Sequence, residues 1–307
     1  MRIVFMGTPD FAVPSLNALV EAGHDVCGVF SQPDKPVGRH QNKLKATPVK
    51  ECALSHNIPV FQPVSVKDGA AYEQLKQLDP ELIVVAAYGR VLPEEILNMP
   101  PKGCINVHSS LLPKYRGAAP INWAVVNGDA ETGVTIMHMA QELDAGDIID
   151  QIRTPIDPDE SVEAVHDRLA ELGGKILVDV VEQIANGTAT RTPQDSTQAT
   201  YAPMLSRELS NIDWTQPAKA IHDKIRGLSP WPAASTNIIS DTTIKIFGSV
   251  NLGENTSAAA GTILAAGKQG IDVACGDGKV LRLTQLQAPG GKRMAAADYL
   301  RGHPITV

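Results

Sequence analysis

Hydrophobic and polar positions follow two different patterns along the chain. In the first half, short runs of β-branched and apolar residues are separated by amphipathic stretches, which is typical of a parallel sheet with helices packed against it. The predicted strands cover residues 2–6, 25–30, 59–61, 82–87, 104–107 and 134–139. The predicted helices cover residues 12–22, 48–56, 69–78 and 119–127, and Thr47 followed by Pro48 predicts the start of the second.

A longer helix is predicted further along. Apolar residues recur at steps of three and four over 162–184, and this spacing lines one face of a helix. Gly173 and Gly174 lie inside the pattern and are candidate points of interruption. Residues 186–200 are rich in Gly, Thr, Gln, Pro and Ser without periodicity, which indicates a linker.

The pattern changes after the linker. One short helix is predicted near 218–226, followed by short alternating runs at 243–247, 262–265, 271–274 and 280–286 with glycine-rich turns between them. Closely spaced short strands favour a small barrel or sandwich. The sequence therefore predicts two domains, over 1–188 and 207–307, joined by residues 189–206.

Charge divides along the same line. Residues 1–206 hold 16 Lys and Arg against 26 Asp and Glu, whereas residues 207–307 hold 11 against 8. The net charge of −7 thus conceals a basic C-terminal part, and the change of sign indicates that the two parts have different roles. A hydrophobic content of 43% without low-complexity tracts excludes a disordered chain.

Other classes are set aside by what the sequence lacks. No apolar run approaches the ~18 residues of a membrane span, and the apolar N-terminal run is too short for a signal peptide, so we expect a cytoplasmic protein without membrane association. The four cysteines are far apart and form no Cys-x-x-Cys pair, which argues against a zinc cluster or a disulfide framework. Free and mostly buried thiols are expected instead.

The first predicted strand ends in a turn, Gly7-Thr8-Pro9-Asp10, at the position of a dinucleotide fingerprint. The turn does not match G-x-G-x-x-G, so binding of NAD is not supported.

A more informative pair follows at the end of a predicted strand. Asn106 and His108 are two residues apart, so their side chains point to the same face, where α/β proteins place their ligand sites. An amide and an imidazole can supply an oxyanion donor and a proton-transfer group, as acyl transfer to an amine requires. A structural histidine is an equally good interpretation of His108 from these residues alone.

Asp144 lies in the glycine-containing loop Leu143-Asp144-Ala145-Gly146-Asp147. Its carboxylate could orient His108 or stabilise the charged imidazole. An ordinary turn or capping residue is the better interpretation without further context.

The stretch 35–50 has five cationic side chains and no acidic one, and its length without periodicity is typical of a functional or mobile loop. Its cations could bind phosphates, and a solvated charge run is the common alternative.

Several segments match a known family in the correct order. Residues 110–120 read Ser-Leu-Leu-Pro-Lys-Tyr-Arg-Gly-Ala-Ala-Pro, and together with Asn106, His108 and the loop around Asp144 they resemble the formyltransferases that use 10-formyltetrahydrofolate. Segments 7–12, 31–39, 87–89, 128–135 and 229–232 resemble the branch of this family that acts on initiator methionyl-tRNA.

The resemblance implies an α/β fold, with a Rossmann-like catalytic domain at the N-terminus and a smaller C-terminal β-barrel similar to an OB fold that binds tRNA. The implied reaction moves the formyl group of 10-formyltetrahydrofolate, the co-substrate, to the α-amino group of methionine on initiator methionyl-tRNA. The implied reaction needs no metal, and the protein is expected to be a monomer. The implied catalytic residues are Asn106, His108 and Asp144, the implied folate-binding residues are Ser110, Leu111, Leu112 and Pro113, and the implied tRNA-binding residues are Arg39, Lys43 and Lys45.

Two alternative functions stay open. The same catalytic set could formylate a small amine, such as a sugar nucleotide or glycinamide compound, or pass the formyl group to water. A chain without catalysis could instead bind RNA or folate. The basic stretch and the basic C-terminal part favour an RNA acceptor.

Overall fold

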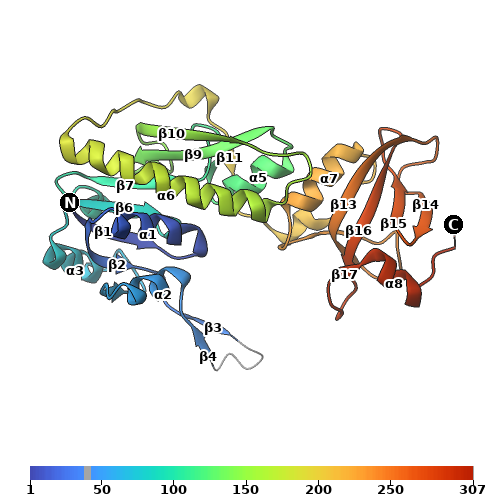
Figure 1. Cartoon of the computed structure of the whole chain (residues 1–307), viewed down its shortest axis with the longest axis horizontal. Coiled ribbons are helices and arrows are strands. Elements are labelled where there is room, and N and C mark those ends of the chain that lie inside the picture. Colours follow the sequence, from blue (N-terminus) through green and yellow to red (C-terminus); the bar gives the residue numbers. More distant parts are fainter. Residues whose placement is uncertain (38–42, 307) are drawn as a thin grey trace. The chain divides into compact units, whose positions relative to one another are not determined.

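The computed structural model describes residues 1–37 and 43–306, which form two compact units (Figure 1). The first unit comprises Met1–Gly117, Gly133–Thr154 and His166–Tyr201, and the second comprises Ala118–Thr132, Pro155–Val165 and Ala202–Val307. Each unit is thus assembled from three segments of the chain. The domain limits expected from composition, at residues 188 and 207, stay a prediction.

A seven-stranded sheet forms the centre of the first unit, in the order β10-β9-β7-β6-β1-β2-β5. The strands are β1 (Arg2–Gly7), β2 (Asp25–Phe30), β5 (Val60–Phe61), β6 (Leu82–Ala86), β7 (Cys104–His108), β9 (Glu131–His138) and β10 (Ile148–Pro155). The pairs β1–β2, β1–β6, β2–β5 and β6–β7 are parallel, as predicted. β9 runs antiparallel to β7, which the sequence did not reveal because hydrophobicity fixes burial and not strand direction.

Helices cover both faces of this sheet, which confirms the predicted Rossmann-like α/β arrangement. α3 (Ala70–Leu78) and α4 (Glu94–Leu97) bury apolar residues against Val4, Met6, Ile83 and Val85 of the strands. α1 (Val13–Glu21), after the 3₁₀ turn η1 (Asp10–Ala12), and α6 (Val162–Asn186) lie on the other face (Figure 1).

The long helix α6 passes through Gly173 and Gly174 without interruption. A Cβ atom at Gly173 would lie 3.0 Å from Cγ1 of Val107, and one at Gly174 would lie 2.9 Å from the carbonyl oxygen of Pro14. The two glycines therefore allow α6 to pack closely against the sheet and α1.

The basic stretch is folded in part. β3 (Lys35–Val37) and β4 (Lys43–Lys45) form an antiparallel hairpin that projects from the unit (Figure 1). α2 (Pro48–Ser55) follows, and the Thr47 side chain accepts a hydrogen bond from the Lys50 amide, which confirms the predicted cap.

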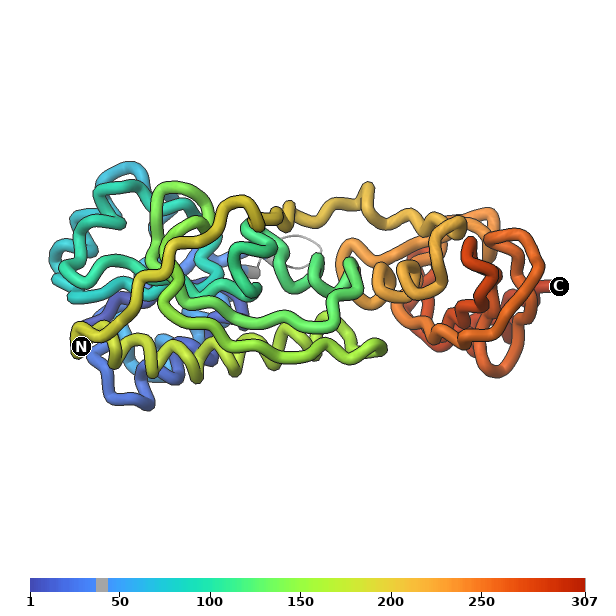
Figure 2. Tube along the Cα trace, turned by 90° about the horizontal axis from the view of Figure 1, so that it is seen from above, coloured from blue at the N-terminus to red at the C-terminus, as the bar shows by residue number. Residues whose placement is uncertain are grey.

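After α6, the chain returns along the first unit (Figure 2). Thr192 forms a β-bridge with Ile148, and the Thr190 hydroxyl donates to the carbonyl of Ile149. The stretch continues through the short helix η2 (Ser196–Gln198) to β11 (Tyr201–Ala202), which pairs with β8 (Arg116–Gly117). Most of the residues interpreted as a linker are thus hydrogen-bonded to the first unit.

The second unit is built on an antiparallel sheet, in the order β12-β13-β16-β15-β14 with β17 beside β16. The strands are β12 (Ala234–Thr236), β13 (Ile244–Asn255), β14 (Ile263–Gly267), β15 (Gly270–Ala274), β16 (Lys279–Gln287) and β17 (Met294–Ala295). α7 (Ala218–Gly227) and α8 (Ala296–Gly302) share its apolar core, while α5 (Pro120–Val126) and η3 (Arg207–Ser210) complete the unit. The predicted C-terminal β fold is confirmed, and its closure into a barrel stays a prediction.

Candidate active site

Asn106 and His108 lie on β7, at the carboxyl edge of the parallel strands. Asn106 is paired with Val85 of β6 and with Met137 of β9, and His108 is paired with Thr135. The two side chains share one face of the sheet because they are two residues apart. His108 is 6% exposed, whereas Asn106 is half-buried. The predicted pair therefore lies where open α/β sheets bind their ligands.

The imidazole of His108 is held from both sides. Its Nε2 atom lies 2.9 Å from the carbonyl oxygen of Tyr115. A carbonyl can only accept a hydrogen bond, so Nε2 carries the hydrogen. Nδ1 lies 3.7 Å from Oδ2 of Asp144, which is ion-pair distance and too long for a direct hydrogen bond. The structure thus brings the predicted histidine and carboxylate together.

Asp144 is fixed by its backbone and its side chain. Its φ of +50° lies in the left-handed region, which Asp tolerates better than most residues. Its Oδ2 accepts a 2.8 Å hydrogen bond from the amide of Gly117, and the side chain is 11% exposed. The carboxylate is therefore directed inward, whereas the carboxylate of an ordinary turn residue would be exposed to solvent.

Gln194 clamps the loop that carries Asp144. Its Nε2 donates to the carbonyls of Asp144 and Gly146, both at 2.8 Å. Its Oε1 accepts from Nε and Nη2 of Arg116, a guanidinium that is 1% exposed. Nη1 of Arg116 contacts the exposed carboxylate of Glu142 at 3.3 Å.

The segment 110–113, predicted to line the folate site, begins two residues after His108, the last residue of β7. Thr135 of β9 anchors it: its hydroxyl donates to the Ser110 carbonyl at 2.6 Å and accepts from the Leu112 amide at 3.1 Å. Nε2 of Gln151 donates both to that hydroxyl and to the carbonyl of Leu112. The segment is therefore fixed in place beside His108.

The turns after β1, β2 and β6 are tied together at the same edge. The hydroxyl of Thr8 and Nε2 of Gln32 both donate to the carbonyl of Tyr88. Burial raises the pKa of the Tyr88 phenol. These contacts stabilise the edge of the sheet without supplying a charged group.

Cys104 is on the same strand as the catalytic candidates, and burial raises its pKa to about 12. It is therefore a neutral thiol and no nucleophile. Cys275 is also buried, while Cys27 and Cys52 are partly exposed, and all four are free. The expectation of mostly buried thiols therefore holds for two of the four.

Two of the predicted RNA-binding residues lie on the β3–β4 hairpin. Lys43 and Lys45 belong to β4, and Arg39 lies outside the described residues. Lys50 takes part in anchoring instead: its Nζ contacts Asp34 and Gln62 at 2.7 and 2.8 Å, and this ammonium lowers the pKa of Asp34.

The described residues contain neither a metal-binding cluster nor a membrane-spanning helix. Among residues 1–37 and 43–306, no group of three or more His, Cys, Asp or Glu side chains is arranged to hold a metal ion. No helix in this part of the chain is long and apolar enough to cross a membrane.

Sequence reasoning missed Gln194 and Thr135, which position the candidates. Gln194 is 50 residues from Asp144 and lies in an aperiodic stretch, so no local pattern marks it. Thr135 follows Gly133, and a Cβ atom at Gly133 would meet Ile152 O at 2.1 Å and Leu111 Cδ2 at 2.5 Å. In the sequence, Gly133 was the one sign that this part of β9 is closely packed.

Known proteins resemble this chain over nearly its whole length. The family described as formyl transferase matches residues 1–181, and the formyl transferase C-terminal domain matches residues 204–304. The methionyl-tRNA formyltransferase of Moorella thermoacetica is 52% identical over 305 residues, which cover 99% of this chain and 97% of that one. The enzyme of the same name from Trichlorobacter lovleyi is 48% identical over 306 residues, which cover 100% and 95%. The chain belongs to the methionyl-tRNA formyltransferase family.

Solved structures with lower identity share the fold. An N-formyltransferase from Helicobacter canadensis, in complex with folinic acid and dTDP-3-aminofucose, is 21% identical with a TM-score of 0.71 and covers 92% of this chain and 98% of that one. HypX from Aquifex aeolicus in complex with tetrahydrofolic acid is 19% identical with a TM-score of 0.65 and covers 98% and 47%. The architecture of the methionyl-tRNA formyltransferase family is thus shared with proteins of other names.

Proposed function

We propose that this chain transfers the formyl group of 10-formyltetrahydrofolate to the α-amino group of methionine on initiator methionyl-tRNA. The product, N-formylmethionyl-tRNA, serves translation initiation. The single observation that carries the proposal is the pairing of buried His108 with Asp144 at 3.7 Å, in a chain of the methionyl-tRNA formyltransferase family.

The reaction forms one carbon–nitrogen bond and breaks another. The α-amine attacks the formyl carbon, and a tetrahedral intermediate develops negative charge on oxygen and positive charge on nitrogen. The amide of Asn106 donates a hydrogen bond to the oxyanion. The bond from the formyl carbon to the folate nitrogen then breaks, and the proton lost by the amine ends on that nitrogen.

His108 moves the proton. Because Nε2–H is directed to the Tyr115 carbonyl, Nδ1 has the lone pair that accepts the amine proton. The resulting imidazolium is stabilised by the Asp144 carboxylate, whose Oδ2 is held by the Gly117 amide. Protonated Nδ1 then also serves as a hydrogen-bond donor to the oxyanion before it returns the proton to the folate nitrogen.

Folate is proposed to bind along Ser110, Leu111, Leu112 and Pro113. This segment leads directly from His108 and is fixed by Thr135 and Gln151. A rigid backbone next to the proton-transfer group can hold the formyl carbon in one position for attack.

Arg39, together with Lys43 and Lys45 of the hairpin β3–β4, is proposed to contact the tRNA. Lys35 and Lys45 are directly opposite each other in the hairpin, and like charges in that position destabilise a strand pair. Phosphate groups would relieve this repulsion, and cationic side chains supply most of the affinity for a nucleic-acid backbone. The basic C-terminal part of the chain, residues 207–307, supports the same partner. We also propose that the enzyme acts as a monomer in the cytoplasm, where its charged tRNA is used.

The test is formyl transfer by the purified chain from 10-formyltetrahydrofolate to charged initiator methionyl-tRNA. Charged elongator tRNA and free methionine serve as parallel acceptors. The proposal expects N-formylmethionyl-tRNA from the initiator alone. Release of tetrahydrofolate without this product would assign the formyl group to water or a small amine, and no release would contradict the enzymatic proposal.

A further inference from the structure

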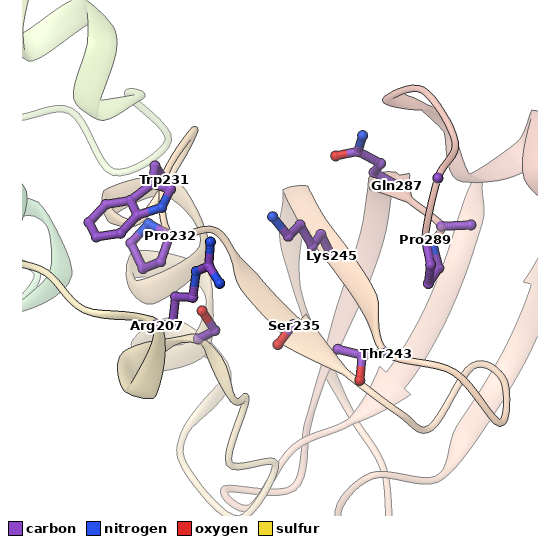
Figure 3. Close-up of a pocket in the computed structure, with 11 residues that line it drawn as sticks. Arg207, Trp231, Pro232, Ser235, Thr243, Lys245, Gln287 and Pro289 are labelled. Carbon is purple, nitrogen blue, oxygen red and sulfur yellow. The ribbon is translucent and has the colours of Figure 1, made fainter. Parts of the chain in front are cut away.

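A cation-lined pocket lies in the second unit, on the outer face of its antiparallel sheet (Figure 3). Its volume is about 530 Å³, within the about 300–1,000 Å³ typical of sites for small ligands. None of its 11 lining residues is acidic, and two are cationic. This composition favours an anionic occupant.

The floor of the pocket is a polar row across three neighbouring strands. Ser235 of β12 is paired with Lys245 of β13, which is paired with Gln287 of β16. Direct pairing places their side chains on one face. The flanking Ile244 and Ile246 point to the opposite face and are fully buried in the core. The row therefore presents hydrogen-bonding groups where the sheet is not covered by the core.

Trp231 forms one wall. Its side chain is 49% exposed, whereas Trp214 in the same unit is 8% exposed and belongs to the core. Figure 3 shows Trp231, Pro232 and Arg207 on one side of the pocket, with Lys245 projecting into the space between them and Gln287. Pro230 and Pro232 flank Trp231, and their rings limit the motion of the backbone that carries the indole.

The two cations of the pocket are not neutralised by the protein. Arg207 and Lys245 are exposed and form no ion pair with any carboxylate of residues 1–37 or 43–306. Other cations of this unit do form such pairs, for example Arg282 with Asp272 at 2.6 Å and Arg226 with Asp223 at 2.7 Å. The uncompensated charge is thus concentrated beside the exposed indole.

We propose that this pocket binds one unpaired nucleotide of the RNA substrate. The base stacks on the indole of Trp231, Gln287 hydrogen-bonds to the edge of the base, and Arg207 and Lys245 hold its phosphate. Stacking on aromatic side chains beside a cationic groove is how proteins bind single-stranded nucleic acid. The inference rests on the proposed function, because it adds a site for a substrate that the function requires.

A third cationic side chain, Arg293, lies next to β13, the strand that carries Lys245. Phe247 is two residues beyond Lys245 on β13, and the guanidinium carbon of Arg293 lies 4.7 Å from the centre of its ring. This cation–π pair fixes Arg293 above the sheet, where it can contact the next phosphate. A proline-rich peptide could also use a Trp and Pro wall, but it would leave these cations unpaired.

Binding of fluorescent tetraadenylate to the full chain, followed by anisotropy, tests the pocket directly. Trp231→Ala should weaken binding about tenfold through loss of stacking, while Trp231→Phe should retain most of the affinity. Lys245→Ala should lower the salt dependence of binding, whereas Lys268→Ala, which removes an exposed lysine outside the pocket, should not. Unchanged melting temperatures confirm that the variants are folded.

Equal affinity of Trp231→Ala and the unmodified chain for tetraadenylate would overturn the inference. So would binding of a proline-rich peptide, and not of RNA, to a site that Trp231→Ala abolishes. Formylation of initiator methionyl-tRNA by the same unmodified preparation separates the two proposals. Its absence contradicts the proposed function, whereas normal formylation with unaltered tetraadenylate binding in Trp231→Ala contradicts only the nucleotide site.

Discussion

Asp144 combines a left-handed backbone with an inward carboxylate, and its charge is the property that the proposed mechanism needs. Asn in its place tolerates the same backbone and can still accept the Gly117 hydrogen bond. Asp144→Asn should therefore fold normally and lose about a hundredfold in kcat, because the imidazolium of His108 loses its counter-charge. Steady-state kinetics and thermal unfolding check both parts.

Asp147 provides a control in the same loop. Its side chain is 36% exposed and contacts Arg191 at 3.7 Å. Asp147→Asn should stay within about twofold of normal turnover, as is usual for a partly exposed ion pair. Near-normal turnover of Asp144→Asn would show that the carboxylate has no part in proton transfer.

At the scale of elements, the return segment after α6 determines the position of the Asp144 loop. Gln194→Ala removes two hydrogen bonds to that loop and leaves buried Arg116 without its amide partner. We expect about a tenfold fall in kcat with little change in the KM for tRNA, because misplacing a proton-transfer group slows chemistry more than binding.

Gln198 is the matched control for Gln194, since it lies four residues later and its side-chain amide donates a hydrogen bond to Asp195. Gln198→Ala should leave both kinetic constants unchanged. If Gln194→Ala raised KM and spared kcat, the segment would act in binding and not in positioning.

The same segment shows what could be read from the sequence and what could not. Periodicity predicted α6, apolar runs predicted the strand that carries Asn106, and the pair Thr47-Pro48 predicted the capped start of α2, because these depend on local sequence. It did not predict β10 or the antiparallel direction of β9, because pairing is decided by distant residues. The hydrogen bonds from Gln194 to the Asp144 loop likewise cannot be predicted without the fold.

At the scale of the whole molecule, three neutral histidines make stability depend on pH. Burial lowers the pKa of His24, His138 and His222 below the ordinary value of 6.5. At His222, burial outweighs the nearby carboxylate of Asp159, and Ser249 Oγ lies 2.9 Å from Nδ1, where it can donate to the neutral ring.

These shifts have a definite sign. As pH falls below 6.5, the unfolded chain binds protons at these positions that the folded chain resists, so the free energy of unfolding decreases. The melting temperature should therefore fall from about pH 7.5 to about pH 5.5, and His222→Gln should flatten that fall. A melting temperature that rises or stays constant over this interval would contradict the assignment of neutral buried imidazoles.

Binding of the whole tRNA should be governed by charge at the β3–β4 hairpin. Changing Arg39, Lys43 or Lys45 to Ala should each weaken initiator tRNA binding and lower the slope of log affinity against log salt by about one. Lys102→Ala, an exposed lysine of the same unit, is the control. Equal slopes for all four variants and the unmodified chain would exclude the hairpin as a phosphate contact.

Proton transfer by His108 is tested by single-turnover formyl transfer to charged initiator methionyl-tRNA by the unmodified chain and by His108→Ala, with both substrates saturating. We expect His108→Ala to slow the chemical step by about a hundredfold or more while tRNA affinity and the fold are retained. His56→Ala, which removes an exposed histidine far along the sequence, should react at the normal rate. A near-normal chemical step in His108→Ala would show that this residue does not transfer the proton.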